Sequence, residues 1–132
     1  MKQWVLDTNV VVSGLMNPRG HPAAILNAVA NGRVKMVCDA RILAEYRDVL
    51  SRPRLKPAPD KIAAFLGSLR GQSFVTPVSL PATAPDPDDL IFVEAALATT
   101  GKTIVTGNMA HYPTGILHGA RVLTPSQAAA EL

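Results

Sequence analysis

Short apolar runs alternate along the chain with longer segments in which apolar residues recur at helical spacing. The short runs predict buried strands, and the longer segments predict helices that each bury one face. We expect strands over about residues 3–6, 34–38, 74–78, 103–106 and 121–123. We expect helices over about residues 22–31, 40–51, 61–69, 90–100 and from 125 onward. Strands that alternate with helices predict an α/β fold, with a mostly parallel central sheet covered by helices on both faces.

Gly, Pro, Asn and Asp mark the boundaries between these segments. The segment 13–20 is rich in Gly, Pro and Asn and predicts a loop. The helices that follow Asp39, Asp60 and Thr124 are expected to be capped by those side chains. The segment 77–87 contains four prolines and predicts a stiff extended loop. It is not expected to link two domains, because the segment after it is too short to fold alone, so residues 1–132 are predicted to form one domain.

Composition narrows the class of protein. Hydrophobic residues make up 48% and charged residues 17% of the chain, which is typical of a compact folded protein rather than a disordered one. The net charge of +3 is compatible with a polyanionic partner without requiring one, and no block of Lys and Arg resembles a nucleic-acid-binding tail. Aromatic residues make up only 5%, which argues against a platform for base stacking.

Cys38 is the only cysteine, which excludes an intramolecular disulfide and a multi-cysteine zinc site. It lies in the apolar run 34–38, a position that favours a buried structural thiol over a nucleophile. No apolar run approaches the length of a membrane span, and the N-terminus leads directly into the first predicted strand without room for a signal peptide. We therefore expect a cytoplasmic protein with no membrane partner.

The acid Asp7 ends the first predicted strand and is followed by Thr8 and Asn9. Ligands of open parallel sheets bind just beyond the carboxyl ends of the strands, so Asp7 is a candidate site residue. Asp and Asn are also favoured in turns, and taken alone these three residues fit a simple turn equally well.

Glu45 and Glu94 lie on two of the predicted helices. Glu45 falls at the edge of the apolar stripe of helix 40–51, where it can turn toward a cleft or stay in solvent. Glu94 falls away from the apolar face of helix 90–100 and is expected to be solvated.

Three acids precede the helix 90–100, namely Asp86, Asp88 and Asp89. Asp86 suits the N-cap position and Pro87 the first helical position. Capping explains one acid and tolerates two, but three acids within four residues exceed what a cap needs. Crowded carboxylates repel one another, and a bound cation would relieve that repulsion.

Asp7 thus ends a predicted strand, Glu45 lies at the edge of a helix's apolar stripe, and Asp89 precedes a helix. The fold can bring these three acids together. Without a cluster of Cys or His, oxygen ligands predict Mg²⁺ or Mn²⁺ rather than zinc. Carboxylate-held Mg²⁺ that activates a water is a common solution for phosphodiester hydrolysis.

Four segments, in this order, resemble the motifs of PIN-domain proteins. They are Leu-Asp-Thr-Asn-Val at 6–10, Leu-Ala-Glu-Tyr at 43–46, Asp-Pro-Asp-Asp at 86–89 and Ile-Val-Thr-Gly-Asn at 104–108. Each motif is weak alone, but their order and spacing are specific, and the resemblance spans nearly the whole chain. Within this family, the sequence most resembles the toxin components of toxin–antitoxin systems.

The resemblance implies a three-layer α/β/α sandwich and a metal-dependent endoribonuclease that cleaves single-stranded RNA. It matches the family's acids to Asp7, Glu45 and Asp89, which would hold Mg²⁺ or Mn²⁺, with Asp86 as an auxiliary ligand. It implies that Glu45 orients or deprotonates the attacking water. Positions that support the acids or contact the scissile phosphate match Thr8, Asn9, Ser13 and Thr106. A cognate antitoxin and a homodimer are the protein partners that the family implies.

Asn108 stands where many relatives carry a fourth Asp, so the fourth catalytic position of this chain is neutral. This residue is compatible with a PIN-like module that binds RNA or protein without cutting. Two unrelated folds fit the sequence less well. A receiver-like domain would need a second acid near Asp7 and a Lys after the last strand, where Asn9 and Thr124 stand. A haloacid-dehalogenase-like phosphatase would need Asp at Asn9.

Overall fold

The computed structural model describes residues 2–52, 58–69, 72–77, 79–80 and 87–132. Seven α-helices and a short 3₁₀ helix are assigned among these residues, together with a five-stranded sheet. Within these residues, every helix is too short or too polar to span a lipid bilayer.

All neighbouring strands of the sheet run parallel, in the order β3-β2-β1-β4-β5. The strands are β1 (Lys2–Leu6), β2 (Val34–Cys38), β3 (Ser73–Phe74), β4 (Thr103–Val105) and β5 (Arg121–Leu123). Parallel pairing aligns the last residues of three strands, because Leu6 pairs with Val105 and Val105 pairs with Leu123. The residues that follow these strands therefore meet at one edge of the sheet.

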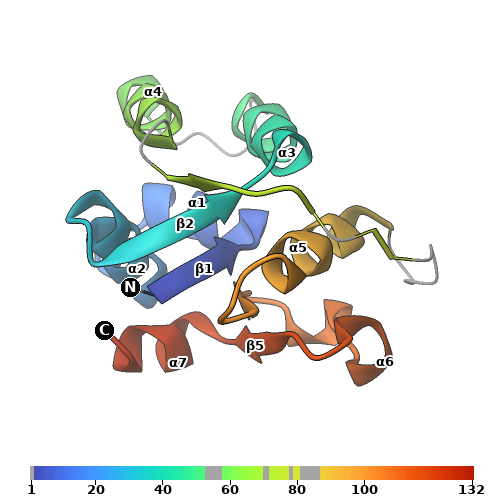
Figure 1. Ribbon diagram of the computed structural model, residues 1–132. Helices are drawn as coiled ribbons and strands as arrows, with labels where there is room; N and C mark the ends of the chain where they lie inside the picture. The colour runs from blue at the N-terminus through green and yellow to red at the C-terminus, as the bar shows by residue number, and fades with distance from the viewer. Residues whose placement is uncertain (1, 53–57, 70–71, 78, 81–86) are drawn as a thin grey trace.

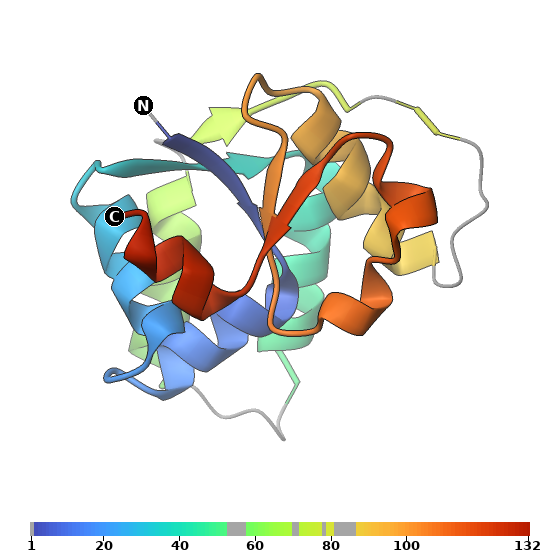
Figure 2. The same cartoon turned by 90° about the horizontal axis from the view of Figure 1, so that it is seen from below.

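The helices cover both faces of the sheet, which confirms the predicted α/β/α architecture. They are α1 (Thr8–Met16), α2 (His21–Ala30), α3 (Ala40–Leu50), α4 (Pro59–Ser68), α5 (Pro87–Leu97), α6 (Thr114–Leu117) and α7 (Pro125–Ala130), with the 3₁₀ helix η2 at Met109–His111. Figure 1 shows their succession along the chain. In the view of Figure 2, α2 and α7 lie on one side of the sheet and α5 and α6 on the other.

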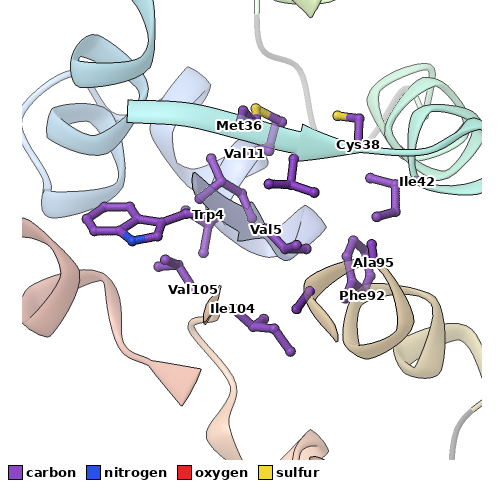
Figure 3. Close-up of a cluster of buried hydrophobic side chains, with 14 of the residues drawn as sticks. Trp4, Val5, Val11, Met36, Cys38, Ile42, Phe92, Ala95, Ile104 and Val105 are labelled. Atoms are coloured by element: carbon purple, nitrogen blue, oxygen red, sulfur yellow. The ribbon is translucent and has the colours of Figure 1, made fainter. Parts of the chain in front are cut away.

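The core lies between the sheet and these helices (Figure 3). Consecutive residues of the central strands are buried, as in Trp4, Val5 and Leu6 of β1, because both faces of the sheet are covered. Phe92 of α5 and Ile42 of α3 pack into the same cluster. Burying each large apolar side chain contributes about 1.5–3 kcal/mol, and this term fixes the helices against the sheet.

The predicted loop at 13–20 is wrong in its first half, since α1 runs from Thr8 to Met16. Gly14, which by composition indicates a loop, instead allows α1 and α2 to pack closely. A Cβ atom at Gly14 would lie 2.5 Å from Leu26 Cδ1 and 3.1 Å from the backbone carbon of Pro22. The glycine is required here by the contact between two helices rather than by a turn.

Two predicted caps are confirmed and one is wrong. Asp39 Oδ1 accepts hydrogen bonds from the backbone N–H groups of Arg41 and Ile42 at 2.8 and 2.9 Å, and Thr124 forms the predicted capping box. Asp60 does not cap α4, because the helix begins earlier, and it lies within the first turn. The expected cap Asp86 lies outside the described residues, as does Val78, the expected end of the third strand.

Candidate functional site

The strand β1 lies at the point where the order of strands reverses, with β2 on one side and β4 on the other. Ligands of open α/β sheets bind in the crevice at such a point, beyond the carboxyl ends of the strands. Asp7 follows β1 and Thr106 follows β4. Backbone hydrogen bonds of 2.9 Å extend the pairing past the strand ends, from Asp7 N–H to Val105 O and from Thr106 N–H to Leu123 O. The topology thus places these two polar residues side by side.

The Asp7 carboxylate is buried, with 6% of the residue exposed. Its Oδ2 atom accepts two hydrogen bonds of 2.9 Å, one from the Thr106 hydroxyl and one from the Tyr112 hydroxyl. Asp7 occupies the N-cap position of α1, yet its side chain makes no capping hydrogen bond. The residues after it continue directly into the helix, so the interpretation of this segment as a simple turn is wrong.

The Thr106 hydroxyl connects this acid to the residues around it. Besides donating to Asp7, Thr106 Oγ1 lies 3.0 Å from the backbone N–H of Asn108 and 3.5 Å from the side-chain nitrogen of Asn9. Asn9 Oδ1 in turn accepts a 2.9 Å hydrogen bond from the backbone N–H of Gly107. A Cβ atom at Gly107 would lie 3.3 Å from that same Oδ1 atom, so glycine permits this close approach.

The remaining residues matched to this edge differ in burial. Thr8 is 7% exposed, and its hydroxyl is buried without a hydrogen-bond partner among the described residues. Ser13 on α1 and Asn108 beyond β4 are exposed. Hydrogen bonds therefore connect the side chains of Asp7, Asn9 and Thr106. The backbone N–H of Asn108 joins the same network by donating to Thr106.

Helix α3 is attached to the end of β1 by Tyr46, which is fully buried and whose hydroxyl donates a hydrogen bond to the Leu6 carbonyl. Burial raises the pKa of the Tyr46 hydroxyl well above its ordinary value of 10.0, and the nearby Cys38 and Asp7 add to the shift. The hydroxyl is therefore a proton donor at any ordinary pH. Glu45, the neighbour of Tyr46 on α3, is half-buried.

The acids before α5 are only partly described. The backbone of Asp89 lies in the first turn of α5, but its side chain is outside the described part of the structure, and Asp86 is outside it altogether. Among the residues that are described, no group of three or more His, Cys, Asp or Glu gathers in a way that could hold a metal ion. The groups described at this edge of the sheet are still suitable ligands for a hard divalent cation. They are oxygen atoms, both hydrogen bonds on Asp7 fall on Oδ2, and the adjacent Thr8 hydroxyl is buried without a described partner.

Sequence reasoning missed Tyr112, whose surroundings predict only a turn or short helix. The residue is 5% exposed and belongs to the hydrophobic core. Its only signal is its type, an aromatic residue in a segment otherwise rich in Gly, Pro and polar residues. An aromatic body in the core with a polar tip at the site is a common use of tyrosine.

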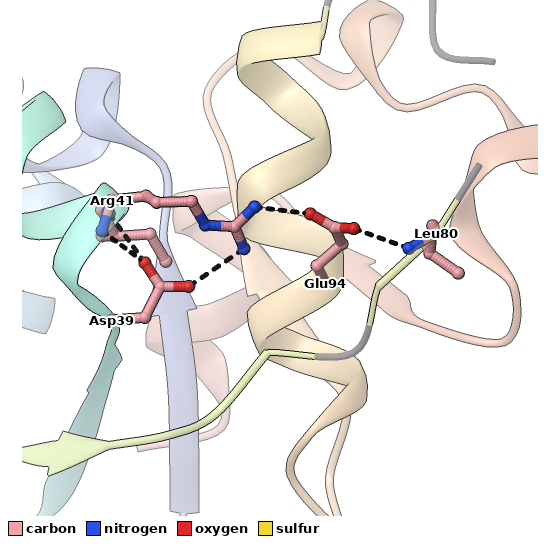
Figure 4. Close-up of polar contacts among 5 residues, drawn as sticks. Asp39, Arg41, Leu80 and Glu94 are labelled. Atoms are coloured by element: carbon pink, nitrogen blue, oxygen red, sulfur yellow. Dashed lines mark hydrogen bonds and ion pairs between the residues drawn. The ribbon is translucent and has the colours of Figure 1, made fainter. Parts of the chain in front are cut away.

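The expectation that Glu94 is solvated is wrong, since it is 6% exposed. Its Oε1 atom forms a 2.7 Å ion pair with Arg41 Nη1, and its Oε2 atom accepts a 2.7 Å hydrogen bond from the backbone N–H of Leu80 (Figure 4). Arg41 also pairs with the buried Asp39 at 3.1 Å. This network joins the start of α3 to α5, the two helices that carry Glu45 and Asp89.

A family model described as PIN domain matches residues 3–110 of the chain. The match begins within β1, covers β2, β3 and β4, and includes Asp7, Glu45, Asp89 and Asn108. No curated protein matches the sequence.

Proposed function

This chain belongs to the PIN-domain family, whose members are generally nucleases, and from that premise we propose that it is a metal-dependent endoribonuclease that cleaves single-stranded RNA. The observation that carries the proposal is the Asp7 carboxylate at the switch point of the sheet. Two hydroxyls fix one of its oxygens, a construction that orients a carboxylate toward a ligand rather than toward a helix end.

PIN domains typically use divalent metal ions. In the proposed mechanism Asp7 and Asp89 would hold Mg²⁺ or Mn²⁺, with Glu45 and Asp86 as further ligands. When bound, such an ion neutralises charge that develops on the scissile phosphate. Asp7 keeps one orientation because the hydroxyls of Thr106 and Tyr112 both donate hydrogen bonds to its Oδ2 atom.

Other side chains complete the proposed reaction. Glu45 orients the attacking water or accepts its proton. Asn108 offers an amide donor to a phosphate oxygen or a neighbouring carboxylate. Thr8 and Ser13 support the acids or contact the phosphate, and Asn9 holds Gly107, and with it the turn after β4, in place.

The wider role that we propose is that of a toxin in a toxin–antitoxin pair, acting in the cytoplasm as a homodimer and restrained by a cognate antitoxin protein. This part rests on the motif resemblance alone. Co-purification with the product of a neighbouring small reading frame would support it, and an isolated gene whose expression leaves growth unaffected would contradict it.

A second candidate function is a PIN-like module that binds RNA or a protein without cutting. Asn108 favours it, because this exposed, neutral residue stands where many relatives carry a fourth acid. In that case RNA would be retained but not shortened.

One assay separates the two candidates. We expect the purified protein to shorten single-stranded RNA in Mg²⁺ or Mn²⁺ and to lose this activity in EDTA. A matched pair of variants excludes a contaminating nuclease, because Asp7→Asn should be inactive while Asp48→Asn, at an exposed acid on α3, should remain active. Intact RNA from several sequences would favour the binding module, and cleavage undiminished by EDTA would exclude the metal mechanism.

A further inference from the structure

An open pocket of about 360 Å³ lies between α1, the start of α2 and the residues beyond β4. We call it the α1 pocket; it is lined by Asn9, Val10, Ser13, Pro22, Gly107, Asn108 and Pro125. Its volume is large enough for one nucleoside and too small for a folded partner to enter.

The α1 pocket is directly connected to the acid at the switch point. Asn9 and Asn108, which line the pocket, both approach Thr106 Oγ1, the atom that donates to Asp7. The Asn108 N–H and Asp7 Oδ2 are thus 3.0 and 2.9 Å from one and the same oxygen atom. A group that occupied the pocket would lie within one nucleotide's length of a phosphate bound at Asp7.

The lining shows which part of a nucleotide fits. None of the seven lining residues carries a charge, so the pocket offers no counter-charge to a phosphate. Pro22 and Pro125 supply apolar surface, and Val10 adds little because it is only 1% exposed. Ser13 and Asn108 are exposed, and their hydroxyl and amide groups supply both donors and acceptors. A neutral ring with apolar faces and polar edges, as in a nucleobase, matches this lining.

We propose that the α1 pocket binds the base of a nucleotide next to the scissile phosphate and thereby sets which RNA positions are cut. The proposal rests on the proposed function, because it assumes that the phosphate lies at Asp7. The phosphate and its neighbouring base are then divided between two adjoining sites, one acidic and able to hold a cation, the other neutral.

Binding of single nucleosides to the full chain in EDTA tests the pocket without any cleavage. Adenosine, guanosine, cytidine and uridine are titrated separately while backbone amide signals are followed by NMR, with ribose as the comparator because it lacks a base. At least one nucleoside is expected to shift the amides of Gly107 and Asn108 with millimolar affinity, and ribose is not.

Two variants test whether the nucleoside binds in the α1 pocket. Ser13→Leu fills it from α1, and Asn108→Ala removes an amide from an exposed loop, where folding is not at stake. Each is expected to weaken nucleoside binding by about tenfold or more. Ala63→Leu adds the same bulk at an exposed position on α4, outside the pocket, and should change nothing.

The outcomes separate this inference from the nuclease proposal. Nucleoside binding that both pocket variants weaken supports the pocket even if no RNA is cut. Metal-dependent cleavage without nucleoside binding overturns the pocket and leaves the nuclease standing. Equal shifts with ribose, or binding unaffected by both variants, also overturn it.

Discussion

The Tyr112 hydroxyl donates a 2.9 Å hydrogen bond to Oδ2 of Asp7, although the two residues are 105 positions apart in the chain. The Thr106 hydroxyl donates to the same atom. Two donors on one carboxylate oxygen fix the plane of the group, so the direction in which the other oxygen points is set by residues that need not touch a ligand themselves.

Tyr112→Phe should therefore weaken Mn²⁺ binding by roughly tenfold to a hundredfold, the range for residues that orient a metal ligand. The lost hydrogen bond should lower the free energy of unfolding by about 1–3 kcal/mol. Calorimetric titration and urea unfolding measure the two effects. Tyr46→Phe is the matched control, since it removes an equally buried hydroxyl that bonds a backbone carbonyl, and it should affect stability more than metal binding. Equal Mn²⁺ affinities in the wild type and Tyr112→Phe would contradict the positioning role.

Asp7→Asn and Asp89→Asn should each reduce cleavage by more than roughly a hundredfold, the scale of losing one group that stabilises developing charge. Both should fold. The amide oxygen of Asn at position 7 can still accept from Thr106 and Tyr112, and Asn is well tolerated near a helix start. Melting temperatures without metal and rates with metal test the two parts separately, and inactivity that merely accompanies unfolding would count against the assignment.

Asn108→Asp should raise the number of bound Mn²⁺ ions or their affinity. The Asn108 backbone is bonded to Thr106, and a carboxylate at this position would add a fourth acid to the site. The natural protein should bind one ion per site in the absence of RNA. Calorimetric titration of both forms decides this, with Asn31→Asp as a control for added charge, because Asn31 precedes β2 at the opposite edge of the sheet. Two tight ions in the natural protein would place Asn108 outside the metal site.

Stability should fall above about pH 9 because of Cys38. Burial raises the pKa of its thiol from 9.0 to about 12, so between these values the unfolded chain loses this proton and the folded chain keeps it. The contribution is complete below pH 9 and is lost as the pH rises, by about 1.4 kcal/mol per pH unit. Urea unfolding of the wild type and Cys38→Ala from neutral to alkaline pH isolates the effect. The curve for Cys38→Ala should be flatter above pH 9, and parallel curves would contradict the argument.

Arg41→Ala should destabilise the protein more than Glu94→Ala. Without Arg41, the buried carboxylates of Asp39 and Glu94 lose their shared cation, whereas Glu94→Ala leaves Arg41 paired with Asp39. The side chain of Arg41 is 42% exposed, which moderates the cost, so we expect about 2–3 kcal/mol for Arg41→Ala. Arg52→Ala breaks an ion pair with the exposed Asp48 and should cost less than about 1 kcal/mol. Urea unfolding of the three variants gives the order of their losses in stability. A larger loss for Glu94→Ala than for Arg41→Ala would contradict the shared-cation explanation.

Much of the fold follows from local patterns. The strand Val34–Cys38 begins and ends where its apolar run does, because a strand covered by helices on both faces needs apolar side chains on both. The first half of the expected loop at 13–20 could not be predicted correctly. Gly14 is a turn signal by composition, and only the distance to Leu26 on the next helix shows that it serves helix packing.

The residues of the candidate site also fall into two groups, those that the sequence predicts and those that it does not. Asp7 and Thr106 could be predicted, since each ends an apolar strand and parallel topology brings such ends together. Tyr112 and Glu94 could not, because their partners lie far away in the sequence and no spacing rule connects them. The charge of Glu94 predicts a solvated side chain, and the ion pair with Arg41 overrides that tendency.

The long separation between Asp7 and the residues that hold it has a consequence for the chain during synthesis. Strands β1 and β2 are neighbours in sequence and can pair while translation continues, but Thr106 and Tyr112 leave the ribosome 99 and 105 positions after Asp7. Pairing of β1 with β4 joins residues as far apart as Val5 and Ile104, and such a non-local contact forms slowly. A chain synthesised only as far as β2 therefore carries Asp7 without the two hydroxyls that hold it, and the site can form only after Tyr112 has been added.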